Sequence, residues 1–137
     1  MKTNFEYTGG VDVFVSAYID CALWSSIDDS GNPLDDNYSA SDLAPEALKR
    51  MAADCAAFVV SYGTLLADWN ASQAGHDFWL TRNHHGAGFW DRGRAANGDA
   101  LTDAAHACGE VYLYAGDDGH IYTDGFVAGI PPGGVTC

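Results

Sequence analysis

The sequence predicts a single α+β domain, in which two main helices and a short helix pack on a small antiparallel sheet of two hairpins. Apolar residues recur at helical spacing in the first half of the chain, and alternating apolar residues with glycine-rich turns follow in the second half. A length of 137 residues fits one domain, and a hydrophobic share of 47% is typical of folded globular proteins. We expect residues 1–124 to form this domain and the Gly- and Pro-rich residues 125–137 to be irregular.

Two helices are expected in the first half. Between residues 13 and 26, apolar side chains recur three and four positions apart, which favours a helix over the strand that the alternating valines of residues 11–15 also allow. A long second helix is expected to begin at residues 41–46, where a Ser or Asp cap, a proline and an acidic residue stand together, and its apolar face continues to Trp69. Gly63 predicts a kink or an end within it.

The segment between these helices, residues 28–37, is expected to be an exposed acidic loop. Its Gly, Asn and Pro residues end both helices and strands. The density of carboxylates invites comparison with calcium sites, but the spacing of acids, glycine and glutamate that defines an EF-hand is missing. We therefore expect no calcium site in this loop.

Hairpins and a short helix are expected in the second half. Residues 76–82 alternate as a strand, residues 83–88 supply a turn and residues 89–91 begin a returning strand. Residues 99–109 predict a short helix that is capped by Asp and ended by Gly. Residues 111–122 predict a second hairpin around a Gly-Asp-Asp-Gly turn.

Charge is distributed unevenly along the chain, which has 6 basic and 19 acidic residues and a formal net charge of −13. Residues 3–48 contain nine acidic residues and residues 95–137 contain six, and neither segment has a Lys or Arg. Such a field repels nucleic acid and attracts basic surfaces. We expect a partner with a basic surface and no direct binding of nucleic acid, although high net charge also simply keeps small proteins soluble.

Features of export and membrane insertion are not expected. No apolar run approaches the ~20 residues of a membrane helix, and residues 1–20 lack the pattern of a signal peptide. We therefore expect a cytoplasmic protein that makes no membrane contact. The four cysteines have no metal-knuckle spacing and are expected to be free thiols; they are Cys21, Cys55, Cys108 and Cys137.

Residues 75–93 concentrate aromatic, glycine and arginine residues, a composition that suits recognition. Large rigid side chains and arginine are enriched at binding hot spots. The candidates for partner binding in this stretch are Trp79, Arg82, His84, His85, Trp90 and Arg92. The same residue types also build cores, and we expect Phe78 and Leu80 to point inward. An ion pair of Asp77 with Arg92 that locks the hairpin is an equally weighted alternative for the polar residues.

Metal and catalytic motifs are missing from the sequence. The possible zinc ligands form neither an HExxH helix nor a CxxC pair; they are His76, His84, His85, Cys108 and His120. A two-carboxylate glycosidase built from Asp77 and Asp91 is conceivable, but there is no nucleophile elbow and no phosphate-binding loop. We expect no metal, no other cofactor and no enzyme activity.

The chain resembles a family of short uncharacterised proteins encoded by bacteriophages and other mobile elements. The segments that carry the resemblance are residues 22–26 (ALWSS), 33–38 (PLDDNY), 76–83 (HDFWLTRN), 85–93 (HGAGFWDRG) and 113–119 (LYAGDDG). It extends from about Ala17 to Tyr122. The resemblance implies no chemistry, but it implies a phage-infected bacterial cell as the setting, in which small acidic proteins often bind host defence machinery.

We therefore hypothesise a phage-encoded acidic protein, monomeric or homodimeric, that binds and inhibits a host defence complex of the CRISPR or restriction type. The acids expected to imitate phosphates against a basic groove are Asp28, Asp29, Asp35, Asp36 and Asp42. The alternative is a small enzyme or a metal- or ligand-binding protein that uses the hairpin of residues 76–92.

Overall fold

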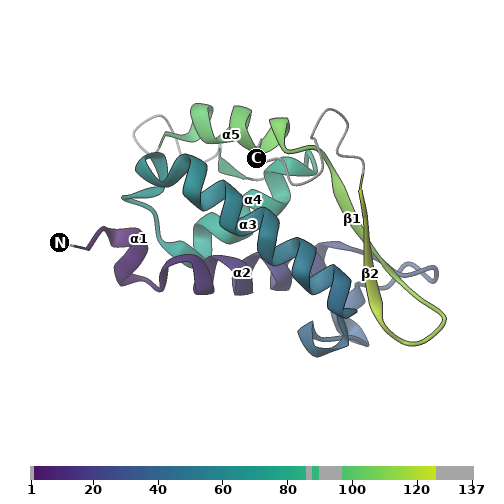
Figure 1. Cartoon of the computed structure of the whole chain (residues 1–137). Coiled ribbons are helices and arrows are strands. Elements are labelled where there is room, and N and C mark those ends of the chain that lie inside the picture. The colour runs from purple at the N-terminus through teal and green to yellow at the C-terminus, as the bar shows by residue number, and fades with distance from the viewer. Residues whose placement is uncertain (1, 86–87, 90–96, 126–137) are drawn as a thin grey trace.

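The structure is a computed structural model that describes residues 2–85, 88–89 and 97–125. Helices form a bundle, and a two-stranded antiparallel sheet stands at one end of it (Figure 1). The described elements are α1 (Asn4–Tyr7), α2 (Gly10–Ser25), the 3-10 helices η1 (Leu34–Asp36) and η2 (Ala40–Asp42), α3 (Pro45–Leu66), α4 (Ala71–Arg82), α5 (Gly98–Ala107), β1 (Val111–Ala115) and β2 (Ile121–Gly125).

Helix α4 is the buried centre of the bundle and lies among α2, α3 and α5 (Figure 1). Nine of its twelve residues are buried, and three of those nine are polar. The side chain of Asn70 starts the helix by accepting a hydrogen bond from the backbone N–H of Gln73 at 3.1 Å. Gly75 allows α4 to approach α2 closely, because a Cβ atom at this position would overlap the carbonyl oxygen of Phe14.

The core is an aromatic cluster centred on Phe78 of α4. The Phe78 ring stacks on Phe58 of α3 with ring centroids 4.1 Å apart. It also packs against Tyr18 and Phe14 of α2, at centroid distances of 5.3 Å and 5.8 Å. The guanidinium carbon of Arg82 lies 5.2 Å from the centre of the same ring. Contacts of this kind stabilise a core beyond the burial of their area, by about 0.5–1.5 kcal/mol for each aromatic pair.

Helices α2, α3 and α5 lie where the sequence predicts helices. The long helix bends where Gly63 predicts a kink, because the preceding Tyr62 has the non-helical angles φ −123° and ψ 21°. The helix ends at Leu66 rather than at Trp69. Helix α5 follows Asn97, and Asp99 therefore lies in its first turn rather than at its cap.

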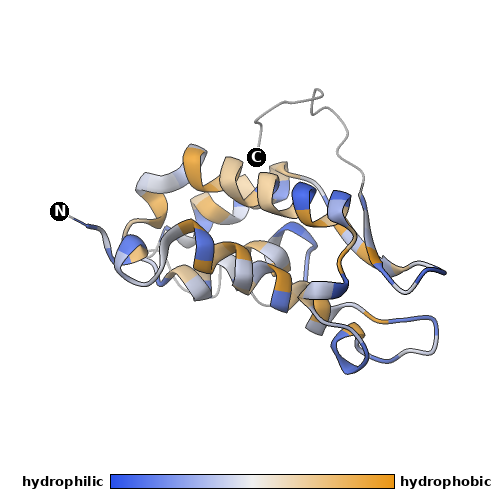
Figure 2. Cartoon of the chain, turned by 60° about the horizontal axis from the view of Figure 1, so that its bottom comes forward, coloured by the Kyte–Doolittle hydropathy of each residue, from blue (hydrophilic) through white to orange (hydrophobic). Residues whose placement is uncertain are grey.

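The predicted second hairpin is present as β1 and β2. The strands pair in an antiparallel register that places Tyr114 opposite Tyr122 and Tyr112 opposite Asp124. The outer edge of β2 is held by the chain that follows η2: the backbone N–H of Ala44 donates to the carbonyl oxygen of Ile121 at 2.8 Å. The loop between α2 and α3 is therefore attached to the sheet. Figure 2 shows hydrophilic residues along this loop and at the tip of the hairpin.

The predicted hairpin of residues 76–91 is wrong. Residues 76–82 belong to α4, and the described part of the chain contains one hairpin and five α-helices rather than two hairpins and three helices. The alternation of residues 76–82 is misleading because α4 is buried on nearly all sides, so no polar face marks a helical period. The coarser prediction of helices with an antiparallel sheet is confirmed. Residues 90–91 and the tail 126–137 lie outside the described residues.

No single helix in the described ranges is long and apolar enough to cross a membrane. Helices α3 and α4 reach the necessary length and composition only as a pair, and the chain bends by 117° between them.

Candidate functional site

Arg82, expected at a binding face, is completely buried at the end of α4. Its guanidinium donates to the Tyr18 hydroxyl at 3.0 Å and to the Asp54 carboxylate at 2.9 Å. It also donates to the carbonyl oxygens of Cys108 and Gly109 at 3.0 Å and 2.9 Å, which cap the C-terminal end of α5. Arg82 thus joins α2, α3, α4 and α5 from inside the bundle, and it is not available to a partner.

The environment of Arg82 fixes two protonation states. Burial acts to lower the pKa of its guanidinium, but the adjacent Tyr18 and Asp54 outweigh burial and raise the pKa above its ordinary value. Burial raises the pKa of the Tyr18 hydroxyl because a phenolate would lose its hydration there. Arg82 therefore stays charged and Tyr18 stays neutral at physiological pH.

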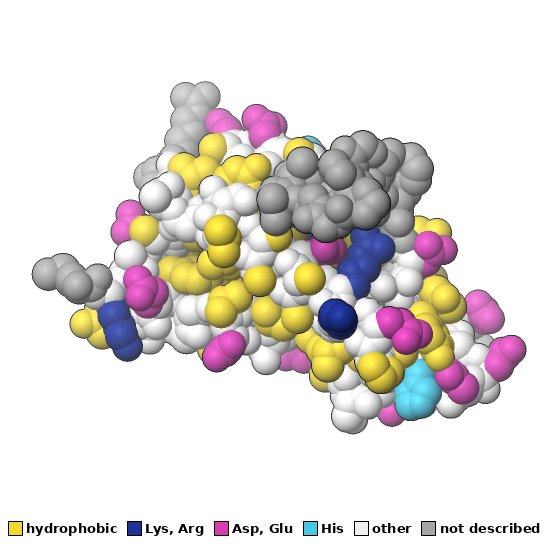
Figure 3. All heavy atoms as spheres, in the orientation of Figure 1, with side chains coloured by type: hydrophobic (Ala, Val, Ile, Leu, Met, Phe, Trp, Pro, Cys, Tyr) yellow, Lys and Arg dark blue, Asp and Glu magenta, His cyan; other side chains and the backbone are white. Residues whose placement is uncertain are grey.

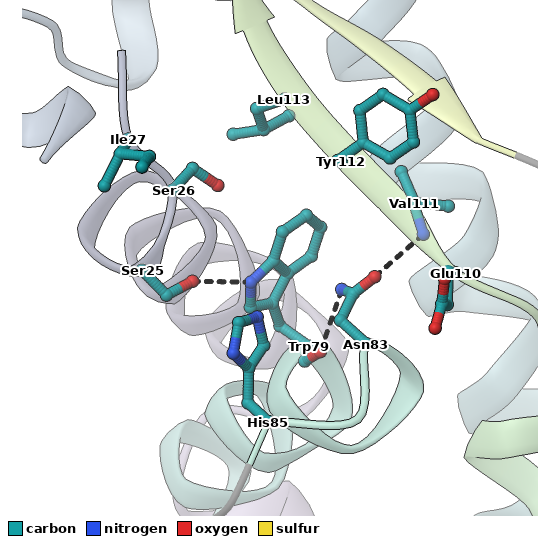
Figure 4. A pocket seen from close by; sticks show the side chains of 10 residues that line it. All are labelled: Ser25, Ser26, Ile27, Trp79, Asn83, His85, Glu110, Val111, Tyr112 and Leu113. Atoms are coloured by element: carbon teal, nitrogen blue, oxygen red, sulfur yellow. Dashed lines mark hydrogen bonds between the residues drawn. The ribbon is translucent and has the colours of Figure 1, made fainter. Parts of the chain in front are cut away.

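Trp79 is also buried, with 2% of its surface exposed, and it lies at the floor of a groove. The groove encloses about 360 Å³ between residues 25–27 at the end of α2 and residues 110–113 at the start of β1. The indole Nε1–H of Trp79 donates to Ser25 Oγ at 2.7 Å. Asn83 donates from Nδ2 to the Trp79 carbonyl oxygen at 3.0 Å and accepts from the backbone N–H of Val111 at 2.9 Å. Figure 4 shows the indole between the two walls of this feature, which we call the β1 groove.

His84 and His85 are exposed, as the sequence predicts for a turn. His84 has a left-handed backbone (φ 57°), and its ring stacks on His106 of α5 with centroids 4.3 Å apart. Its Nε2 atom lies 3.8 Å from the carboxylate of Glu110, a pair that is exposed on both sides and so contributes little stability. His85 lines the β1 groove, as Glu110 does. Trp90 and Arg92, the other candidates from this stretch, lie outside the described residues.

Acidic side chains from two distant parts of the sequence gather at one end of the molecule. Residues 27–43 contain five acidic residues and residues 111–125 contain three more, and neither segment has a Lys or Arg. The bridge between Leu43 and Ile121 holds the two segments together. In Figure 3 acidic side chains crowd the end that the loop and the hairpin form. We call these two segments the acidic end.

The five candidate acids of the loop divide into two kinds. Asp28 Oδ1 accepts hydrogen bonds from the backbone N–H groups of residues 30 and 32, both at 2.9 Å, and Asp42 accepts one from residue 39 at 2.8 Å. These two carboxylates shape the loop as turn and cap residues do. Asp29, Asp35 and Asp36 are exposed and accept no hydrogen bond from the described residues. Their charges are therefore available to a partner.

The acids of the hairpin were not among the candidates. Asp118 accepts hydrogen bonds from the backbone N–H of His120 and from the Tyr122 hydroxyl. The bond from Tyr122 holds the pKa of Asp118 below its usual value and raises the pKa of Tyr122 to about 12. Asp124 lies opposite Tyr112 and accepts a hydrogen bond from its hydroxyl at 3.3 Å. Only the topology of the sheet places these carboxylates beside the loop.

The described residues contain no group of three His, Cys, Asp or Glu side chains that could hold a metal ion. Of the possible zinc ligands, Cys108 is buried and its thiol donates to the Ala104 carbonyl oxygen at 3.4 Å. The Nδ1 atom of His76 lies 3.6 Å from the Oδ1 atom of Asp77. His120 lies at the tip of the hairpin.

The glycosidase alternative is wrong for Asp77, which is completely buried and accepts a hydrogen bond from Gln73 at 2.9 Å. A carboxylate closed off in this way cannot reach a glycosidic bond. Its partner in that hypothesis, Asp91, lies outside the described residues.

Three cysteines of the described chain are buried thiols: Cys21, Cys55 and Cys108. Burial, with a smaller effect of the nearby Asp77, raises the pKa of the Cys21 thiol to about 12. Such a thiol is unreactive at physiological pH, because the thiolate is the nucleophile. Cys137 lies outside the described residues.

No family model, no curated protein and no solved structure matches this chain.

Proposed function

We propose that this protein is a non-catalytic inhibitor that binds a basic, nucleic-acid-binding surface of a bacterial host defence complex through its acidic end. The observation that carries the proposal is the convergence of the loop and the hairpin, which gathers eight acidic residues and no Lys or Arg. Charge of this kind raises association rates with a positive partner and disfavours nucleic acid itself. In a phage-infected bacterium, phage-encoded inhibitors of the CRISPR or restriction type act on defence complexes of this kind.

The division among the loop acids supports a role beyond solubility. Asp28 and Asp42 build the loop, whereas Asp29, Asp35 and Asp36 are exposed and accept no hydrogen bond from the described residues. A basic groove that binds phosphates offers regularly placed cations, which such carboxylates can contact in place of a nucleic acid. The proposed partner surface therefore comprises these three acids and the acids of the hairpin.

The test is a pull-down with tagged protein from a bacterial lysate at low and high salt, followed by mass spectrometry. The variant D29N/D35N/D36N removes three charges of the acidic end and spares the two acids that build the loop. The matched control D12N/D68N/D103N makes the same change in net charge, from −13 to −10, at exposed positions in α2, α5 and the turn after α3.

We expect wild-type protein and the control to retain nucleic-acid-handling proteins that salt releases, and the loop variant to retain about tenfold less. Added double-stranded DNA should compete for the same proteins. Equal capture by the two variants would contradict a role for the acidic end. Capture that DNA does not displace would contradict phosphate imitation.

A further inference from the structure

The outer edge of β1 is open along the β1 groove. Gly116 N–H donates to the His120 carbonyl oxygen at 2.8 Å, which makes these residues a hydrogen-bonded pair of the hairpin. Because such pairs alternate in antiparallel strands, Tyr114 and Tyr112 bond to β2, whereas the peptide groups of residues 111, 113 and 115 point away from it. The bond from Val111 N–H to the side chain of Asn83 confirms this direction.

The two edges of the hairpin differ. The outer edge of β2 is held at Ile121 by Ala44, but no described residue bonds to the N–H and C=O groups of Leu113 and Ala115. Natural proteins usually protect an open edge with Lys, Pro or a bulge. Residues 111–115 have none of these and carry no charge at all.

The groove beside this open edge has the features of a peptide site. Its rim exposes two large apolar side chains, Ile27 on one wall and Tyr112 on the other, which are 64% and 57% exposed. Its floor is the Trp79 indole, fixed by the bond to Ser25. An extended segment lying here can bond to the backbone of β1 while its alternate side chains enter the groove.

The charge around the groove selects the occupant. Glu110 lines one end, and the acidic loop begins directly after Ile27 at the other wall. A second copy of the chain would bring its own net charge of −13 against these acids. A cationic segment with apolar residues at alternate positions fits both the charge and the lining.

We propose that the open edge of β1 and the β1 groove bind an extended, cationic segment of a partner protein, about five residues long, as a third strand of the sheet. This site borders the acidic end and shares β1 with it, but it uses the backbone of β1 and the groove rather than the exposed carboxylates. It does not depend on the proposed function.

Two proline substitutions test the proposal as a matched pair. Ala115→Pro removes an N–H group from the open edge of β1 and keeps every bond between β1 and β2, since residue 115 is in a non-hydrogen-bonded pair. Thr123→Pro makes the same change on the outer edge of β2. Thermal melts establish that both variants are folded before binding is measured.

The probe is a fluorescein-labelled hexapeptide of alternating Val and Lys, compared with one of alternating Val and Glu. Binding is measured by fluorescence anisotropy and located by amide shifts in ¹⁵N NMR spectra. We expect the Val-Lys peptide alone to bind and to shift the Leu113 and Ala115 amides. Ala115→Pro should weaken it about tenfold, as for one to two lost hydrogen bonds, and Thr123→Pro less than twofold.

Three results would overturn the proposal. Shifts confined to the amides of Asp29, Asp35 and Asp36, with binding lost in D29N/D35N/D36N, would mean attraction to the acidic end only. Equal binding by the two proline variants would exclude strand addition on β1. A dimer in sedimentation experiments that Ala115→Pro dissociates would assign the edge to a second copy. Peptide binding that persists in D29N/D35N/D36N separates this site from the acidic end, whatever becomes of the proposed function.

Discussion

Replacement of Arg82 separates a structural role from a binding role more sharply than any other change in the chain. Arg82 is completely buried and donates four hydrogen bonds, two of them to the carbonyl oxygens that end α5. Arg82→Ala leaves these carbonyl oxygens and the Tyr18 hydroxyl without this donor, and leaves Asp54 with Arg50, 3.7 Å away, as its cationic partner. We expect a large loss of stability and no direct effect on partner binding.

The magnitude follows from the burial of the ion pair. Breaking a buried pair by removing one partner costs about 3–5 kcal/mol, a large part of the 5–15 kcal/mol that stabilises a typical domain. Arg82→Lys keeps the charge but cannot reproduce the fork of donors, and we expect it to cost roughly 2 kcal/mol. Asp54→Asn should cost about 2–3 kcal/mol, because it leaves the completely buried guanidinium of Arg82 without a neutralising carboxylate, although the amide oxygen can still accept a hydrogen bond.

Urea unfolding followed by tryptophan fluorescence and circular dichroism measures these losses. With an m-value of roughly 2 kcal/mol/M, Arg82→Ala should lower the midpoint by about 2 M and Arg82→Lys by about 1 M. A loss below about 1 kcal/mol for Arg82→Ala, as for an exposed ion pair, would refute the buried position. If the alanine variant does not fold, Arg82→Lys and Asp54→Asn decide: losses below about 1 kcal/mol for both would refute the buried position.

Two further changes test the packing of α4 and the turn of the hairpin. Gly75→Ala should destabilise the fold by about 2–4 kcal/mol, because its Cβ would overlap the Phe14 carbonyl oxygen, whereas the control Gly63→Ala has open space and should be neutral or slightly stabilising in urea melts. In ¹³C NMR titrations Tyr122 should ionise near pH 12, and near pH 10 in Asp118→Asn. The bond should therefore stabilise the turn fully between about pH 4 and about pH 10, the ordinary pKa values of the two groups in the unfolded chain. This contribution should be lost as the pH falls through the lowered pKa of Asp118 and as it rises from about 10 to about 12.

The elements that the sequence predicts well are those with one face in water. Helices α2, α3 and α5 show apolar residues at three- and four-residue spacing, and the β1–β2 hairpin carries a strong glycine turn. Helix α4 has no such contrast, because its polar residues Asp77 and Arg82 are as buried as Phe78. Asn70 is a sequence signal for the start of α4, because asparagine is favoured at helix caps and its side chain accepts a hydrogen bond from the backbone N–H of Gln73.

The candidate site was predictable only where it depended on local chemistry. The exposed loop acids follow from turn residues and charge, and Asp29, Asp35 and Asp36 are exposed as expected. Trp79 and Arg82 were assigned to a surface because hot spots and cores draw on the same residue types, which composition cannot separate. The hairpin acids and the open edge of β1 needed the strand register, which depends on contacts between distant residues.

Residues 79–83, the part of the expected recognition surface that ends α4, position both proposed surfaces from inside. The Trp79 indole donates a hydrogen bond to Ser25, where α2 ends and the chain enters the acidic loop. The Asn83 side chain accepts a hydrogen bond from the backbone N–H of Val111, where β1 begins. Arg82 donates to the carbonyl oxygens at the end of α5, directly before β1 in the chain. One turn of α4 therefore fixes both walls of the β1 groove. Substitutions there should disturb both surfaces together, whereas changes in the loop or at the open edge should disturb only one.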